Sequence, residues 1–295
     1  MGNNSIEVQN DGSPIISVII SFFDAERFIK ETIESVLQQH FGDWELILVD
    51  DGSSDRSTPI ALNYAKDFQN KIFYTNHKNH TNKGLSANRN AGLSLAKGRY
   101  ITFLDADDIW LTGHLANMLH LIQCQKVPLV CESTEYWYNW SNPSKSNKLI
   151  HIGAEANQIH FPPALSLQLY PLGEGSSPCM HALIIEKETI LKYRGFDESF
   201  TGMYEDIVFL SKIFLNEPVF ISSTCNNLYR QRDDSMLSNA HNTGKYNFYR
   251  KKFLNWYKNY LTTQNISDEK IRQSLKKAFR PYSIRQTLIN LIKRY

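Results

Sequence analysis

The sequence predicts an α/β fold in which a mostly parallel central sheet is flanked by helices and followed by a C-terminal helical extension. Strand, helix and strand patterns alternate at short intervals between residues 15 and 104, which is typical of βαβ units. Two acidic clusters, at 50–51 and 105–108, directly follow apolar strands. Because ligands of parallel sheets bind at the carboxyl ends of strands, these clusters indicate a functional site.

The first half of the chain contains the clearest elements. β-branched residues over 15–22 predict a strand that is buried on both faces. Apolar residues at helical spacing, with Asp24 as N-cap, predict a helix from 28 to about 39. The other elements expected here are strands over 44–49, 71–75 and 100–104, a helix that begins at Pro59 and a helix over 85–96.

The second half is less regular. Residues 139–180 are rich in Asn, Ser, Pro and Gly, which predicts loops and short elements, and a strand over 182–185 and a helix over 207–214 follow. An aromatic stripe at helical spacing begins at Tyr246, and one or two basic helices broken at Pro281 complete the chain. We therefore expect a flexible N-terminus (1–13), an α/β domain (14–240) and a basic, aromatic helical extension (241–295).

The composition favours a globular protein in a reducing compartment. The chain has 295 residues, 42% of them hydrophobic, which is enough for one large α/β domain and an appendage. Its four cysteines lack paired short spacings and indicate neither a zinc site nor a disulfide framework. The N-terminus lacks the pattern of a signal peptide, and no stretch is long and apolar enough to span a bilayer. We therefore expect a cytoplasmic protein.

The charge is unevenly distributed along the chain. From Lys245 onward, thirteen Lys or Arg stand against two acids, a charge of +11 that leaves −9 for the first 244 residues. Residues 271–295 carry seven basic residues and no acid, interleaved with apolar ones. This segment could lie on the inner face of an anionic membrane, or it could pack on the acidic body of the protein. One side of the segment could also do the first while the other does the second. The aromatic stripe favours domain packing over nucleic-acid stacking, so we expect no nucleic-acid partner.

Asp105 and Asp107 are candidates for a metal and diphosphate site. Both follow an apolar strand, where hard oxygen ligands can share Mg²⁺ or Mn²⁺ with a diphosphate. A metal ion there would neutralise the charge on a leaving nucleoside diphosphate. The Asp-x-Asp spacing alone favours a capping or turn role, but the preceding strand and the rest of the pattern favour the metal site.

Two further acidic pairs are candidate site residues. Asp51 could accept the N3–H of uracil or thymine, and guanine also offers donors, whereas Asp50 and Asp51 together could simply form a turn. Glu205 and Asp206 stand at a helix start, where acids stabilise the helix. The functional alternative for this pair is proton abstraction from an acceptor hydroxyl.

Several segments resemble, in order, the family 2 glycosyltransferases of GT-A fold, enzymes typical of bacterial cell-surface glycan biosynthesis. The resemblance spans about residues 14–235. The matching segments are ISVIISFFD (16–24), IESVLQQ (33–39), LVDDGSSD (48–55), GLSANRNAG (84–92), FLDADD (103–108) and YED (204–206). Agreement of several motifs in one order makes chance similarity implausible.

The resemblance implies roles for residues that bind the nucleotide and the metal. Ser21 and Phe23 match residues that line the base, and Asp51 matches the carboxylate that binds it. Asp105 matches an acid near the ribose, and Asp107 matches the ligand of Mn²⁺ or Mg²⁺.

The resemblance also implies a catalytic pair and flanking basic residues. Asp206 matches the catalytic base, and Glu205 matches an acceptor contact. Arg89 matches a basic residue near the nucleotide, although a surface helix arginine is an equal alternative. The segment 229–235, with Arg230 and Arg232, loosely resembles the part that closes over the diphosphate.

The implied activity is inverting, metal-dependent transfer of one sugar from a nucleotide sugar to a hydroxyl of a growing glycan or lipid-linked saccharide. Uridine is the first expectation for the base, with thymidine and guanosine open. Single addition is expected because the chain lacks the Gln-x-x-Arg-Trp segment and spanning helices of processive synthases. The alternatives are a sugar-nucleotide nucleotidyltransferase and a non-catalytic nucleotide-sugar or membrane-binding module.

Two departures from the family pattern stand out. Phe23-Asp24 replaces the commoner Tyr-Asn, which keeps a stacking ring but loses a hydroxyl. Asn88 replaces a small residue, and we expect it to disturb a local helix contact.

Overall fold

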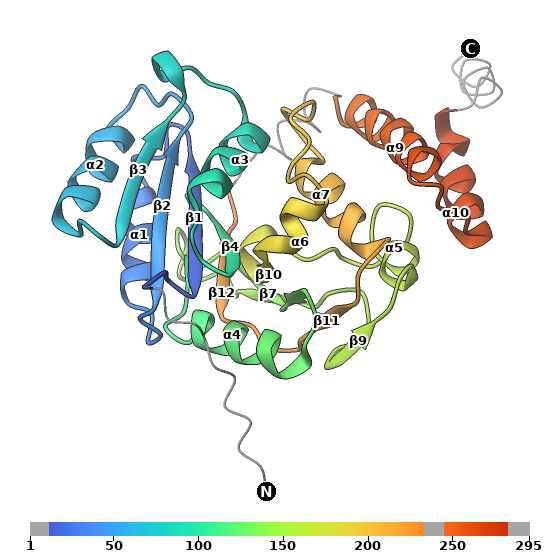
Figure 1. Ribbon diagram of the computed structural model, residues 1–295, viewed down its shortest axis with the longest axis horizontal. Helices are drawn as coiled ribbons and strands as arrows, with labels where there is room; N and C mark the ends of the chain where they lie inside the picture. Colours follow the sequence, from blue (N-terminus) through green and yellow to red (C-terminus); the bar gives the residue numbers. More distant parts are fainter. Residues whose placement is uncertain (1–11, 233–244, 283–295) are drawn as a thin grey trace, which may run out of the picture.

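The structure is a computed structural model that describes residues 12–232 and 245–282 (Figure 1). Most of the predicted flexible N-terminus (1–13), the end of segment 229–235 and the last part of the basic tail (283–295) lie outside the described residues. Within the described part of the chain, no helix combines the length and apolar character needed to cross a bilayer.

The first half of the chain forms four parallel strands with connecting helices. Its elements are β1 (Ile16–Phe22), α1 (Ile29–Leu37), β2 (Trp44–Asp50), α2 (Ser57–Asp67), β3 (Ile72–Asn76), α3 (Leu85–Leu95) and β4 (Tyr100–Asp105). β1 lies between β2 and β4 and is parallel to both. The strands and helices predicted for this half are confirmed, with small shifts at their ends.

The second half adds shorter elements. They are β5 (Ile109–Trp110), α4 (His114–Gln125), β6 (Leu129–Cys131), β7 (Thr134–Trp137), β8 (Lys148–Ile150), β9 (Gln158–His160), α5 (Ala164–Gln168), β10 (Leu183–Glu186), α6 (Lys187–Lys192), α7 (Glu205–Phe214), β11 (Val219–Ile221) and β12 (Asn227–Arg230). Short 3₁₀ turns occupy Lys78–His80, Met180–Ala182 and Arg280–Tyr282.

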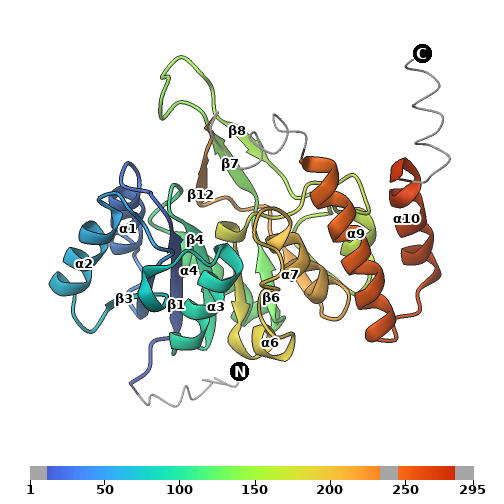
Figure 2. The same cartoon turned by 90° about the horizontal axis from the view of Figure 1, so that it is seen from above.

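The central sheet has eight strands in the order β3-β2-β1-β4-β10-β6-β11-β9. The predicted parallel arrangement holds from β3 to β4, and β11 is parallel to β6. β10 runs antiparallel to both its neighbours, and β9 runs antiparallel to β11. A second sheet, β5-β12-β7-β8, stands beside the first and appears near the top of Figure 2.

The central sheet is covered on both faces, which explains the continuous apolar run of β1. All seven residues of β1 are buried. Val18 and Ile20 join a core with residues of α1 and α4, whereas Ile19 joins a core with residues of α3 and α7. Because side chains alternate along a strand, a strand with helices on both faces must be apolar at nearly every position.

The C-terminal helices α9 (Tyr246–Thr263) and α10 (Glu269–Phe279) pack on the α/β body (Figure 1). Phe253 and Tyr257 of α9 share a core with Phe200 and Val208. The aromatic stripe is therefore packed inside the protein, as predicted. Leu275 of α10 belongs to the same core, so the apolar side of this helix also packs inward.

Two local predictions in the first half were wrong. Asp24 does not cap α1, since Oδ1 of Asp24 instead accepts hydrogen bonds from the backbone of the loop after β2, at 2.7 Å from Ser54 N. α2 begins at Ser57, two residues before Pro59.

Candidate functional site

A cavity of about 820 Å³ opens at the carboxyl ends of β1 and β4. The parallel register of these strands places Ser21 beside Asp105. Residues of the loop before α7, the first turn of α7 and the start of α9 complete the wall. Of the residues singled out in the sequence, those that line the cavity are Ser21, Phe23, Arg89, Asp105, Asp107, Glu205, Asp206 and Arg232.

Asp51 and Arg230 do not line this cavity. Asp51 lies just after β2 and accepts hydrogen bonds from two backbone N–H groups, Lys83 N at 2.7 Å and Gly84 N at 2.9 Å. It thereby holds the loop that leads into α3. Each carboxylate oxygen keeps a second lone pair, so this structural contact does not use the whole acceptor capacity of Asp51.

Arg89 lies between two carboxylates of the cavity. Its Nη2 is 2.9 Å from Asp105 Oδ1, and its Nη1 is 4.0 Å from Glu205 Oε1. Only 3% of the Arg89 side chain is exposed, so the alternative of a surface helix arginine is wrong. A buried guanidinium needs paired charge, and Arg89 therefore ties α3 to the end of β4 and the start of α7.

Asn88, beside Arg89, does not disturb α3. Its side chain is buried, and Nδ2 donates to the backbone oxygen of Val49 at 2.9 Å. The expectation of a disturbed helix contact was wrong, because this bond ties α3 to β2.

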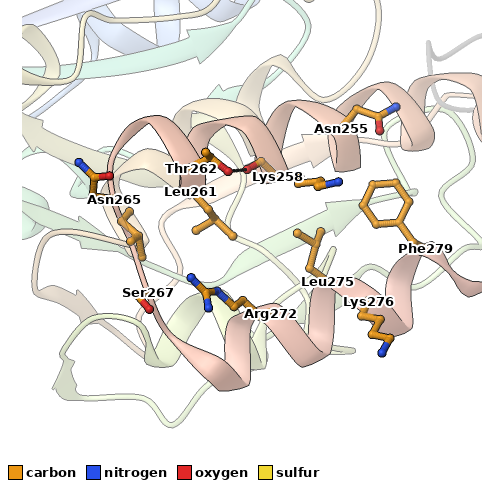
Figure 3. Close-up of a pocket in the computed structure, with 11 residues that line it drawn as sticks. Asn255, Lys258, Leu261, Thr262, Asn265, Ser267, Arg272, Leu275, Lys276 and Phe279 are labelled. Carbon is orange, nitrogen blue, oxygen red and sulfur yellow. Dashed lines mark hydrogen bonds between the residues drawn. The ribbon is translucent and has the colours of Figure 1, made fainter.

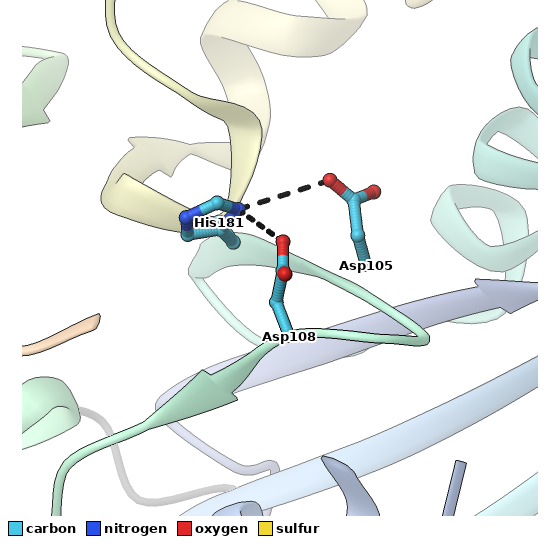
Figure 4. A group of neighbouring side chains, drawn as sticks. All are labelled: Asp105, Asp108 and His181. Carbon is cyan, nitrogen blue, oxygen red and sulfur yellow. Dashed lines mark ion pairs between the residues drawn. The ribbon is translucent and has the colours of Figure 1, made fainter. Parts of the chain in front are cut away.

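Asp105, Asp108 and His181 form a compact cluster at the cavity wall (Figure 4). His181 Nδ1 is 3.0 Å from Asp108 Oδ2 and 3.8 Å from Asp105 Oδ2. Burial alone would lower the pKa of His181, but the two carboxylates raise it well above its usual value. Because a protonated imidazole has no free lone pair, the cluster in this form is an ion-pair network and not a ligand set.

The same network keeps Asp105 ionised. Burial alone would raise the pKa of Asp105, but the hydrogen bond from His181 and the charge of Arg89 lower it to about 2. Asp105 is therefore an anion at any pH near neutrality.

Arg230 and Arg232 both hold the loop that carries Asp107. Arg230 Nε donates to the backbone oxygen of Asp107 at 2.6 Å, and its Nη2 is 2.6 Å from Glu31 Oε2. The Arg230 guanidinium also lies over the ring of Trp137, at 4.3 Å from the centroid. Arg232 Nη2 contacts Asp107 Oδ2 at 2.6 Å and borders the cavity.

Asp105 and Asp107 offer a donor set that fits a divalent cation. Both present carboxylate oxygens at the cavity wall, and Mg²⁺ and Mn²⁺ prefer such hard ligands. Burial and the charge of Asp105 raise the pKa of Asp107, against the opposing charge of Arg232. A cation beside Asp107 would relieve this repulsion.

Glu205 and Asp206 begin α7 and face the same cavity. Burial and the neighbouring charge of Asp206 raise the pKa of Glu205 to about 8. Burial also raises the pKa of Asp206, and Arg89 opposes this shift. Both carboxyl groups of the pair therefore hold a proton more readily than they would in water, and Glu205 is largely protonated near neutral pH.

Three tyrosines meet beside this pair. The hydroxyl of Tyr170 contacts that of Tyr204, and it lies 2.7 Å from the hydroxyl of Tyr246. All three residues line the cavity, and Tyr246 is the first residue of α9. The C-terminal extension therefore forms part of the cavity wall.

The sequence did not single out His181, and it gave Tyr246 only a packing role. His181 is an isolated residue after an irregular stretch, and no spacing links it to the acids more than 70 positions earlier. The helical spacing of the aromatic stripe did predict that α9 is buried. It did not predict that Tyr246 reaches the cavity, because that position depends on how α9 packs against distant segments.

A family model places the chain among known proteins. The model for glycosyl transferase family 2 matches residues 17–173, slightly more than half of the chain. The chain belongs to glycosyl transferase family 2. The matched stretch contains Asp105 and Asp107 but ends before α7, so Glu205 and Asp206 lie outside it.

Curated relatives of this family 2 chain match more than a third of its length. An uncharacterized glycosyltransferase from Haemophilus influenzae is 43% identical over 110 residues, which cover 37% of this chain and 42% of the relative. The UDP-Glc:alpha-D-GlcNAc-diphosphoundecaprenol beta-1,3-glucosyltransferase WfaP from Escherichia coli is 39% identical over 113 residues, or 38% of this chain and 43% of the relative. The chain thus spans less than half the length of these relatives.

Solved structures share the GT-A fold with this family 2 chain. S. aureus TarS 1–349 in complex with UDP-GlcNAc superposes with a TM-score of 0.60 at 22% identity, covering 76% of this chain and 60% of TarS 1–349. The mannosyltransferase PcManGT from Pyrobaculum calidifontis, in complex with GDP-Man and Mn²⁺, gives a TM-score of 0.58 at 14% identity. That superposition covers 90% of this chain and 70% of PcManGT.

Proposed function

We propose that the protein is an inverting, metal-dependent glycosyltransferase that adds one sugar from a UDP-sugar to a hydroxyl of a growing glycan or lipid-linked saccharide. The observation that carries this proposal is the meeting of two acidic pairs at one cavity, Asp105 with Asp107 and Glu205 with Asp206. The family and the fold support it. The printed activity of WfaP supports a UDP-sugar donor and a diphosphoundecaprenol-linked acceptor.

In this proposal the nucleotide lies over the carboxyl end of β1. The ring of Phe23 is 51% exposed at the cavity and offers a stacking surface for a base. Ser21 Oγ is buried without a hydrogen-bond partner among the described residues, and so it can bind a ligand. Asp51 would bind the base through its remaining lone pairs, and Asp105 would approach the ribose.

The proposed metal ligand is Asp107, with Asp105 nearby. A bound Mn²⁺ or Mg²⁺ would supply positive charge to the departing nucleoside diphosphate. The Mn²⁺ in the complex of PcManGT supports this cofactor class. Arg232, which contacts Asp107, lines the cavity and is the proposed basic residue on the diphosphate side; Arg230 would act by fixing the Asp107 backbone.

The proposed catalytic base is Asp206, with Glu205 as an acceptor contact. The acceptor hydroxyl gives its proton to Asp206 while its oxygen forms a bond to the anomeric carbon, and the bond from that carbon to the diphosphate oxygen breaks on the opposite face. The configuration is therefore inverted. A raised pKa makes Asp206 a stronger base than a solvated carboxylate, and protonated Glu205 can donate a hydrogen bond to the acceptor.

The proposed acceptor side lies against the three tyrosines. Tyr170, Tyr204 and Tyr246 offer rings and hydroxyls, the groups that bind saccharides by stacking and hydrogen bonding. Because Tyr246 belongs to α9, the C-terminal extension would contribute to acceptor binding. A lipid-linked acceptor would place the enzyme in the cytoplasm, peripherally at the inner face of the membrane.

A panel of nucleotide sugars tests the proposal directly. With Mn²⁺ present, the matching donor should raise the midpoint of thermal unfolding and be hydrolysed slowly. Release of a nucleoside diphosphate supports sugar transfer, whereas release of pyrophosphate would indicate a nucleotidyltransferase. If a sugar nucleotide stabilises the protein but is not turned over, whichever saccharide acceptor is added, the protein would be a binding module.

A further inference from the structure

The helices α9 and α10 enclose a second cavity, a groove of about 710 Å³ (Figure 3). The catalytic cavity touches α9 at Tyr246, whereas the groove begins at Asn255 and continues into the loop after α9. At 1.5 Å per residue, Tyr246 and Asn255 lie roughly 14 Å apart along the helix, and the two cavities share no lining residue. The groove is therefore separate from the catalytic cavity.

The floor of the groove is apolar. Figure 3 shows Leu261 of α9 and Leu275 and Phe279 of α10 in the space between the two helices. Leu261 and Leu275 are each only 6% exposed, and Ile266 in the connecting loop is half-buried. Such a floor offers an apolar ligand a surface that is already formed.

The rim of the groove is basic. It carries Lys258 from α9 and Arg272 and Lys276 from α10, all exposed. Among the residues that the structure describes, none of these three side chains has a carboxylate within 4.0 Å. Within residues 12–232 and 245–282, none of the three positive charges is therefore neutralised by an ion pair.

The surrounding charge has the same sign. Residues 245–282 contain ten Lys or Arg and two acids, Asp268 and Glu269. Asp268 caps α10 by accepting from Ile271 N at 2.8 Å, and Glu269 accepts from Gln273 Nε2 at 3.0 Å. With both acids counted, residues 245–282 still carry a net charge of 10 − 2 = +8.

We propose that this groove binds an anionic phospholipid at a membrane surface. The anionic headgroup would lie at the rim that carries Lys258, Arg272 and Lys276, and the first carbons of the acyl chains would lie on Leu261, Leu275 and Phe279. An uncompensated basic rim around an apolar floor complements an amphiphile with a negative headgroup. A free inorganic anion would gain nothing from the floor.

Binding to vesicles of equimolar phosphatidylcholine and phosphatidylglycerol tests this site with the full chain. The groove variant is Lys258→Gln/Arg272→Gln/Lys276→Gln. The matched control, Lys251→Gln/Lys270→Gln/Lys277→Gln, removes three exposed charges from the same two helices, outside the groove. We expect the groove variant to lower vesicle partitioning by roughly 100-fold and the control by less than tenfold.

Equal losses in the two variants would overturn the proposal, because they would indicate diffuse attraction by the whole basic surface. No vesicle binding by the wild-type chain would overturn it too. Unchanged circular dichroism and unchanged donor-induced thermal stabilisation of the groove variant would show that the fold and the catalytic cavity are intact.

A second measurement separates a lipid from other occupants of the groove. Dihexanoyl phosphatidylglycerol, below its micellar concentration, should slow amide exchange in α10 of the wild-type chain but not of the groove variant. Equal protection by inorganic phosphate would contradict a lipid site. Light scattering would show whether the wild-type chain self-associates. If the groove variant abolishes that self-association and the lipid does not slow amide exchange, the groove would instead bind a second copy of the chain. Neither measurement uses sugar transfer, so failure here is distinct from failure of the proposed function.

Discussion

Arg89 Nη2 lies 2.9 Å from Asp105 Oδ1, and this buried contact connects helix α3 to the strand end that carries the acidic motif. The same guanidinium is 4.0 Å from Glu205 at the start of α7. One cation thus lies between the proposed nucleotide side and the proposed acceptor side of the cavity. Its removal would leave His181 as the neighbouring cation of Asp105 and would take a positive charge away from Glu205.

Replacement of Arg89 should therefore cost stability. We expect Arg89→Met to lower the free energy of unfolding by about 2 kcal/mol, because it removes a charged hydrogen bond from Asp105, which keeps His181 as its other partner. Denaturant unfolding measures this change. Arg99→Met is the matched control, since Arg99 is 65% exposed and pairs with Glu186 at the surface. It should cost less than about 1 kcal/mol, and equal losses would contradict a buried role for Arg89.

Glu205 should make stability depend on pH. Its pKa rises from 4.5 in the unfolded chain to about 8 in the folded protein, so the folded state favours the protonated form. The stabilising contribution of Glu205 is complete below pH 4.5 and is lost as the pH rises through about 8. Relative to wild type, Glu205→Gln should gain on the order of 4 kcal/mol between pH 5 and pH 9.

The measurement is denaturant unfolding of both proteins across that range. Glu188→Gln, a change at an acid in α6 outside the cavity, serves as the control. A constant difference in unfolding free energy between wild type and Glu205→Gln would show that Glu205 titrates normally.

The parallel half of the fold was predictable because its signals are local. The run over 15–22 and the strand ends at Asp51 and Asp105 sit where the sequence placed them. The helix α4 was not predicted, although Leu115, Met118 and Ile122 have helical spacing and are buried. The helical spacing of these apolar residues could therefore have predicted α4 from the sequence.

Other features depend on contacts between distant segments. The strands β6 and β11 have only three residues each, which is too few to show a hydrophobic period. The antiparallel pairing of β10 with β4 cannot be predicted from either segment alone. Burial of Arg89 likewise depends on distant residues, since its guanidinium lies near the ring of Phe196 and 4.0 Å from Glu205. The sequence named the acids of the site and three of its arginines, but it did not reveal His181 or which acid each arginine pairs with.

Tyr246 offers a test of whether α9 contributes to acceptor binding. We expect Tyr246→Ala to raise KM for the acceptor about tenfold, since it removes a ring and a hydroxyl from the cavity wall, while donor hydrolysis without acceptor stays near wild type. Steady-state kinetics with both substrates separate these effects. The control is Tyr282→Ala, because Tyr282 lies outside the cavity and its hydroxyl donates to Asn247 Oδ1. An unchanged acceptor KM in Tyr246→Ala would remove α9 from the site.

Asp107 should couple the metal to the nucleotide. Without this carboxylate, Mn²⁺ should no longer strengthen the thermal stabilisation by UDP, so Asp107→Ala should lose most of the metal-dependent shift that wild type shows. Differential scanning fluorimetry with UDP, with and without Mn²⁺, measures this. Asp67→Ala, at the exposed end of α2, should behave as wild type. A full metal-dependent shift in Asp107→Ala would place the ion elsewhere.

The central claim is that Asp206 takes the acceptor proton. The most direct test is the rate of sugar transfer by Asp206→Asn, measured with the donor that stabilises the wild-type protein. The account predicts donor binding within about threefold of wild type and a transfer rate at least about 1,000-fold lower, because the amide cannot accept the proton. Transfer near the wild-type rate, with donor binding intact, would contradict the assignment of Asp206 as the base.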